Sequence, residues 1–259
     1  MSKTQAERAS KIDAMMEQAS RALVDRDYFA AERIAASALR RAHHGADYDR
    51  MARILLPLQE ARRMKREMAV DTGRITLVEA DLPEGRAFTA GCYLVGPPRV
   101  GADGRLLRDM ADERGIPAFI LVREPPTRDG LWPIVAVGPV TVRAKIEPPD
   151  LSPPAPAPAK PAGKRPAKAS AAGKPQPVPM AWFIHAAEQL GDEAISQVPL
   201  TLPAAARVDA LVDRLEAVPL HEKLHQRLEE ACREALQEPP RRRKPGMFDP
   251  FDDDLGDAD

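Results

Sequence analysis

Apolar residues recur at helical spacing through the first 70 positions of the chain. The pattern predicts three helices, whose apolar positions are Ile12, Met15, Met16, Ala19 and Leu23, then Ile34, Ala35, Ala38 and Leu39, then Met51, Leu55 and Leu58. We expect breaks near residues 25–27 and at Gly45, because glycine suits the left-handed cap that ends many helices. Pro57 lies inside the third pattern and should kink that helix without ending it.

The pattern between residues 74 and 147 is that of strands. Short runs rich in β-branched and aromatic residues predict strands at 75–78, 92–95, 118–122, 134–137 and 140–142. One helix is expected between the second and third strands, from a cap at Asp103 to Gly115. A connection of this length with a helix inside it is what two parallel neighbouring strands require. The sequence therefore predicts one β-α-β unit extended by two further strands.

Residues 148–179 have a different composition, with 11 of the 27 prolines of the chain and mostly alanine and lysine besides. Such a segment cannot bury enough apolar surface to offset its chain entropy, so we expect a disordered linker between two folded pieces. Beyond it, three apolar stripes predict a helical domain at 180–238. The last residues, 239–259, are basic and then acidic, and are expected to be disordered.

These patterns predict an α+β protein. We expect a helical region at 1–73 packed on a small mixed α/β sheet domain at 74–147, because neither segment is large enough to form a good core alone. The linker, the C-terminal three-helix domain and the tail would follow. The first helical region also resembles a known family at a few positions.

The run Asp27-Tyr28-Phe29-Ala30-Ala31, followed by Ala35, Ala38 and Leu39, resembles the second helix of a tetratricopeptide repeat. The resemblance covers about 35 residues once, and Arg26 stands where the family usually has glycine. In that family, small residues at the positions of Ala31 and Ala38 allow close helix packing. A solenoid needs roughly three repeats, so the resemblance implies a fragment of that architecture at most. An ordinary amphipathic hairpin would show the same alanines.

The composition of the chain limits where the protein is expected to be located and which partners it is expected to bind. No apolar run is long enough to cross a membrane, and the N-terminus lacks the pattern of an export signal. The two cysteines, Cys92 and Cys232, lie in different segments, which favours a reducing, cytoplasmic location. The net charge is −1, and the basic run at 241–244 lacks interleaved aromatic residues, so nucleic acid is not an expected partner.

A loop that could bind an anion spans residues 96–104, between a predicted strand and helix. It has the glycine spacing of a P-loop, but Ala102-Asp103 replaces the required Lys-Ser/Thr pair, which excludes nucleotide hydrolysis by that route. Ligands of open α/β sheets usually bind beyond the carboxyl ends of the strands. We therefore hypothesise that Arg99, Arg123 and Arg128, with Thr127, converge there on a carboxylate or phosphate, although these residues would also suit ordinary solvated loops.

The segment His221-Glu222-Lys223-Leu224-His225 matches the zinc-peptidase pattern HExxH. Its resemblance to the zincins ends there, because the longer family pattern needs glycine at Leu228 and histidine at Ala231. The helical stripe of Leu220, Leu224 and Leu228 instead predicts that His221 and His225 lie at the boundary of the core. A metal site is therefore not expected.

No Ser/His/Asp set can be recognised, and Cys92 lies in a predicted strand where it suits the core. The sequence favours a non-catalytic cytoplasmic interaction or adaptor protein, without a cofactor, whose two modules bind protein partners through a flexible tether. The alternative is a sensor or enzyme for a small anionic ligand at Arg99, Arg123 and Arg128. A zinc hydrolase using His221, Glu222 and His225 is the third possibility.

Overall fold

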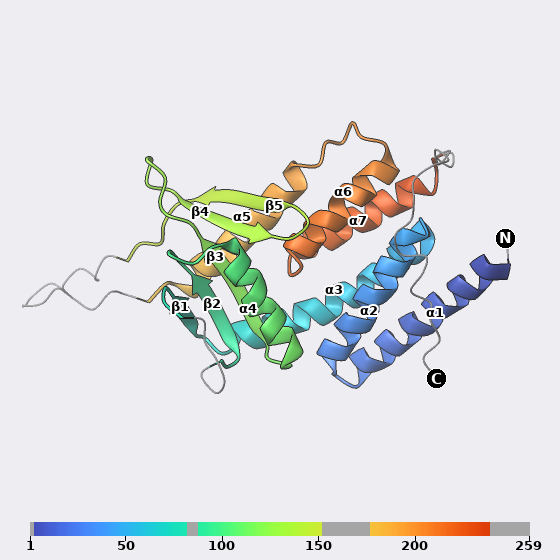
Figure 1. Cartoon of the computed structure of the whole chain (residues 1–259), viewed down its shortest axis with the longest axis horizontal. Coiled ribbons are helices and arrows are strands. Elements are labelled where there is room, and N and C mark those ends of the chain that lie inside the picture. The colour runs from blue at the N-terminus through green and yellow to red at the C-terminus, as the bar shows by residue number, and fades with distance from the viewer. Residues whose placement is uncertain (1–2, 82–87, 152–176, 239–259) are drawn as a thin grey trace, which may run out of the picture.

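The computed structural model describes residues 3–81, 88–151 and 177–238, which form seven helices and a five-stranded sheet (Figure 1). The predicted α+β fold class is confirmed. The helices are α1 (Lys3–Val24), α2 (Tyr28–His44), α3 (Tyr48–Val70), α4 (Gly101–Glu113), α5 (Met180–Ser196), α6 (Ala204–Ala217) and α7 (Glu222–Ala235). The strands are β1 (Ile75–Val78), β2 (Gly91–Val95), β3 (Ala118–Arg123), β4 (Trp132–Val137) and β5 (Thr141–Ile146). No described helix is both long and apolar enough to cross a membrane.

The first three helices break where the sequence predicted, and the two loops between them have the same construction. Asp27 accepts a hydrogen bond from Ala30 N at 3.0 Å, and Asp47 accepts one from Arg50 N at 3.2 Å, so an aspartate caps each following helix. The expected left-handed Gly45 has φ −84°, and Ala46 takes that conformation instead with φ 50°. In both loops the left-handed residue stands directly before the capping aspartate: Arg26 precedes Asp27 with φ 61°, and Ala46 precedes Asp47. Helix α3 continues through Pro57.

The sheet has the strand order β1-β2-β3-β4-β5, with β1, β2 and β3 parallel and the last two strands antiparallel. This arrangement confirms the predicted β-α-β unit, in which α4 connects β2 to β3. The ladder between β3 and β4 contains only two residue pairs, Val122 with Val135 and Arg123 with Ile134, whereas β4 and β5 share six. The sheet therefore opens between β3 and β4 beyond those two pairs.

Two layers of helices cover the sheet. Helix α4 lies very close to one face, because Gly101 and Gly104 have no side chain: a Cβ atom on Gly104 would lie 2.1 Å from Val122 Cγ2. Helices α3 and α5 cover the opposite face, where the Phe119 and Phe183 rings meet edge to face at 5.2 Å. Only α3 of the N-terminal helices packs substantially on the sheet, and α1 and α2 extend beyond it (Figure 1).

The three C-terminal helices share the main core with the rest of the chain, where the sequence had suggested a separate helical domain. Helix α7 packs along α3, and α5 packs across β4 and β5. One continuous apolar cluster contains Ile54 and Leu58 of α3, Phe119 of β3, Phe183 of α5 and Leu224 of α7. An apolar stripe shows which side of a helix is buried but does not show which element covers it, so the sequence left this arrangement open.

The two flanks of the predicted linker lie side by side. Trp182 Nε1 donates a hydrogen bond to the Glu147 carbonyl at 2.7 Å, and the Trp182 ring meets Trp132 edge to face at 5.5 Å. Pro149 and Val178 are buried, so both ends of the predicted linker 148–179 pack against the fold. The middle of the linker, 152–176, and the predicted tail, 239–259, lie outside the described residues. The linker thus does not hold its two flanks apart.

Candidate functional site

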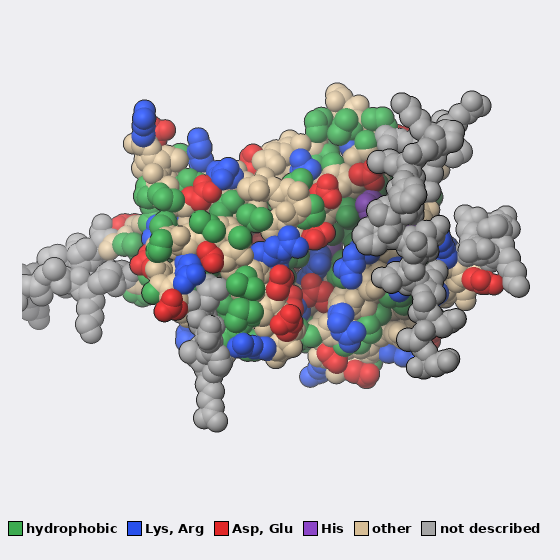
Figure 2. Space-filling model, viewed as in Figure 1, with side chains coloured by type: hydrophobic (Ala, Val, Ile, Leu, Met, Phe, Trp, Pro, Cys, Tyr) green, Lys and Arg blue, Asp and Glu red, His purple; other side chains and the backbone are tan. Residues whose placement is uncertain are grey.

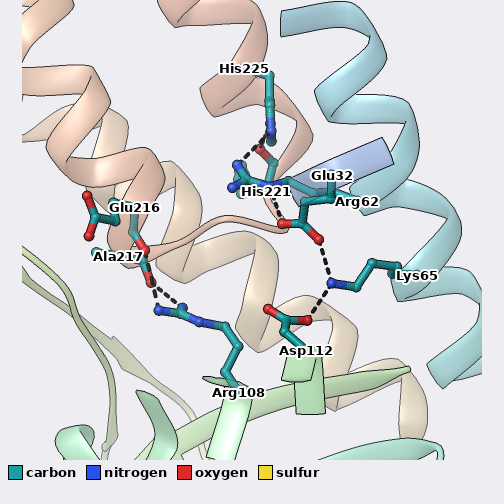
Figure 3. Close-up of polar contacts among 9 residues, drawn as sticks. All are labelled: Glu32, Arg62, Lys65, Arg108, Asp112, Glu216, Ala217, His221 and His225. Carbon is teal, nitrogen blue, oxygen red and sulfur yellow. Dashed lines mark hydrogen bonds and ion pairs between the residues drawn. The ribbon is translucent and has the colours of Figure 1, made fainter. Parts of the chain in front are cut away.

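A buried cluster of charged side chains joins the three helices α2, α3 and α4 (Figure 3). Glu32 of α2 pairs with Arg62 Nε at 2.8 Å and Lys65 Nζ at 2.5 Å, both on α3. Lys65 also contacts Asp112 of α4 at 2.5 Å, and its ammonium group lies 4.3 Å from the centre of the Phe29 ring. Lys65 is only 7% exposed. This cluster links the N-terminal helices to the α/β part of the chain.

The charged groups in this cluster stabilise one another in their ionised forms. Burial alone would raise the pKa of Glu32, but the neighbouring cations of Arg62 and Lys65 outweigh that effect and lower the pKa to about 2. Glu32 is therefore ionised at neutral pH and balances the two cations. The cluster is a structural bridge, since each charged group already has a partner of opposite sign.

His225 extends the cluster to α7. Its Nδ1 lies 3.0 Å from the His221 carbonyl oxygen and its Nε2 lies 3.2 Å from Arg62 Nη1, so the ring donates through Nδ1 and accepts through Nε2. Burial and the charge of Arg62 lower the pKa of His225 to about 3. A metal ion would need the Nε2 lone pair that Arg62 uses. His225 is 1% exposed, so the prediction of a boundary residue was wrong for this position.

His221, just before α7, is also buried, at 3% exposure, and the boundary prediction was wrong here too. Neither ring nitrogen has a hydrogen bond to another described residue, although Nε2 lies 3.4 Å from Asp192 Oδ1 and 3.8 Å from Glu188 Oε2 on α5. Burial lowers the pKa of His221, which keeps the ring neutral. Glu222 is half-buried at the first position of α7. The two imidazoles of the HExxH pattern face different groups, and no described set of His, Cys, Asp or Glu side chains could hold a metal ion.

The His221 ring packs directly on Gly191 of α5, where a Cβ atom would lie 1.9 Å from His221 Cδ2. We expect Gly191→Ala to lower the free energy of unfolding by about 1–3 kcal/mol, because the added methyl group overfills this contact. Urea unfolding measures the effect. Adding His221→Ala to Gly191→Ala should restore much of the loss. Equal losses with and without His221 would contradict this packing.

Arg99 follows the carboxyl end of β2, Arg123 is the last residue of β3, and both arginines are engaged in internal contacts. Arg99 Nε donates to the Ala80 carbonyl at 2.6 Å, and its guanidinium lies 3.3 Å from Asp81. Arg123 pairs with Glu79 at 2.7 Å and stacks on the Trp132 ring at 4.7 Å. Both arginines therefore contact the segment 79–81 after β1, and Arg99 also lies 3.5 Å from Asp103 of α4.

The other two predicted residues of that edge belong to the β3–β4 hairpin. Thr127 exchanges hydrogen bonds with Leu131 across the turn, at 3.1 and 3.3 Å. Arg128 is exposed beside it. No hydrogen bond or ion pair among the described residues joins Thr127 or Arg128 to Arg99 or Arg123. The structure thus brings two of the four predicted residues together.

A cavity that the sequence did not reveal lies where the sheet opens between β3 and β4. It has a volume of about 60 Å³ and is bordered by α4, α5 and the turn between α6 and α7. Its polar lining comes from Arg66, Arg105, Arg108, Glu188 and His221. The spacing of Gly101 and Gly104 was the only local sign in the sequence that a helix approaches the sheet this closely.

The thiols offer no nucleophile at neutral pH. Both cysteines are free and buried, and burial raises the pKa of Cys92 to about 11 and that of Cys232 to about 12.

Comparisons of the chain with protein-family models, curated proteins and solved structures gave no match. The function must therefore be argued from the residues of this chain.

Proposed function

We propose that this protein is a non-catalytic interaction protein that binds another protein through a groove beside the α5–α6 loop. The groove has a volume of about 390 Å³ and lies between that loop, α6 and α7. Its apolar lining consists of Ile195, Val198, Pro199, Leu200, Leu211 and Ala231. Leu200 is 84% exposed, which is the observation that carries the proposal. Apolar side chains gather over this loop at the top of the view in Figure 2.

The rim of the groove indicates the chemistry of the partner. Arg207 pairs with Glu234, and Arg227 pairs with Glu230 at 2.7 Å, so the charges that border the groove cancel. A partner segment with a central apolar side chain and no strong charge fits such a surface, because an apolar centre with a polar rim is the usual form of a protein interface. An acidic or basic peptide would find no uncompensated charge among the described residues that border the groove.

The state of the other candidate groups supports a function without catalysis. Arg99 and Arg123 pair with carboxylates, Arg62 occupies the free nitrogen of His225, and both thiols are buried. Because α5–α7 share a core with α3 and the sheet, we propose one body with one contact surface in place of two tethered modules. The two free cysteines also support our proposal of a cytoplasmic location.

The test replaces Leu200 in the intact chain. Leu200→Asp should abolish retention of a protein partner on an affinity column while changing the free energy of unfolding by less than about 0.5 kcal/mol. Leu56→Asp is the matched control, because Leu56 is also exposed, at 70%, but lies on α3 outside the groove. A protein that the unchanged chain and Leu56→Asp retain and Leu200→Asp releases would support the proposal. Equal retention by both variants would refute it.

A further inference from the structure

The cavity between β3 and β4 contains polar groups whose hydrogen-bonding capacity the described residues leave unused. The ladder between these strands ends at Val122 and Val135, so Ile120 and Val137 border the opening. His221 lines the cavity with a side chain that is 2% exposed, and both of its ring nitrogens lack hydrogen bonds. A buried imidazole in this condition costs free energy unless another molecule supplies its partner.

Arg108 gives the cavity an excess of positive charge. The Arg66 guanidinium pairs with Glu188 at 2.6 Å, and Arg105 lies 3.6 Å from Glu216. Arg108 instead donates to the backbone carbonyls of Ala217 and Glu216 at 3.2 and 3.5 Å, and no described carboxylate pairs with it (Figure 3). These two bonds leave further N–H groups of the guanidinium free. A cation held in this way attracts an anion.

We propose that this cavity binds a small organic carboxylate, with the carboxylate group on Arg108 and the alkyl part against β3 and β4. The walls that face the opening are largely apolar, from Phe119, Ile120 and Val137 among others, so a purely inorganic oxyanion would leave them without contacts. A volume of about 60 Å³ holds roughly four to six water-sized positions. Acetate and propionate match this size. The inference is independent of the proposed protein-binding groove, which shares no lining residue with this cavity.

The test measures ligand-dependent stability of the full chain at pH 7 and constant ionic strength, with chloride as the reference salt. Acetate and propionate should each give a saturable rise in melting temperature, because a ligand that binds only the folded chain stabilises it. Hexanoate, which is too long for the cavity, should give none. Saturation-transfer NMR on the propionate methyl group provides a direct readout of binding.

Variants show whether Arg108 is responsible. Arg108→Gln should weaken acetate binding by at least roughly tenfold, since it removes a charge-assisted hydrogen bond. Arg143→Gln is the matched control, because Arg143 pairs with Glu124 and does not line the cavity. If Arg108→Gln does not fold, Ala187→Val fills part of the cavity and should remove binding while keeping Arg108 in place.

Three results would overturn the proposal. The first is the absence of any saturable effect of acetate or propionate on the unchanged chain, which would mean that the cavity holds water alone. The second is unchanged acetate affinity in Arg108→Gln or, if that variant does not fold, in Ala187→Val. The third is hexanoate binding as strong as acetate binding, which would place the ligand outside the cavity.

Discussion

Replacing Glu32 by glutamine is expected to lower the free energy of unfolding by about 3–5 kcal/mol. The substitution removes the anion that balances Arg62 and Lys65, and it leaves two buried cations with insufficient compensation. Urea unfolding at pH 7, followed by circular dichroism, measures the loss. The effect is large because the cluster joins α2, α3 and α4, so the packing of all three helices depends on it.

An exposed ion pair supplies the control for this prediction. Glu17 pairs with Arg21 on α1, and both side chains are largely in solvent. Glu17→Gln should change the free energy of unfolding by less than about 1 kcal/mol. The Glu32 contribution should also depend on pH: because its folded-state pKa is depressed from 4.5 to about 2, the stabilisation is complete above pH 4.5 and is lost as pH falls toward 2. Equal losses for the two glutamines would show that burial of Glu32 contributes nothing.

Mild acid is expected to destabilise the protein through His225. The pKa of this residue is about 3 in the folded chain, against an ordinary value of 6.5, so only the unfolded chain binds the proton between these values. The contribution of His225 to the free energy of unfolding therefore falls by about 1.4 kcal/mol for each pH unit below 6.5 and stops falling near pH 3. Burial of the imidazole is the main cause of the low pKa, and protonation of Nε2 would also place a second cation against Arg62. Urea unfolding between pH 7 and pH 5 measures this slope.

The assignment to His225 rests on two substitutions. His225→Gln should make the stability markedly less dependent on pH between 6.5 and 5, because the titrating group is gone. His185→Gln replaces a histidine that is exposed on α5 and should leave the pH dependence as it is in the unchanged chain. The assignment would be wrong if both variants kept the same slope.

The elements of this fold could be predicted from local patterns because local residues determine them. Apolar spacing and the aspartates at positions 27 and 47 define the first three helices, and β-branched runs define the strands. The connection containing α4 also predicted the parallel pairing of β2 and β3. These inferences needed information only from residues near one another in the sequence.

The remaining features depend on contacts between distant parts of the chain. Glu32, Lys65 and Asp112 resemble solvated helix residues when each is viewed in its own segment, and only the packing of α2, α3 and α4 brings them together. His221 and His225 lie beside the leucine stripe of α7, and they are buried because α3 and α5 cover that side of the helix. Glu79 and Asp81, which pair with Arg123 and Arg99, come from the segment after β1, which the predicted site did not include. No periodic pattern in the sequence predicts these contacts between distant residues.

The hydrogen bond from Trp182 to the Glu147 carbonyl joins the two segments that the chain connects through residues 152–176. The two flanks of this connection, around Glu147 and Trp182, therefore lie beside each other on the folded surface. The packing of α5 against β5 and of α7 along α3 would hold the two halves together even in a chain cleaved there.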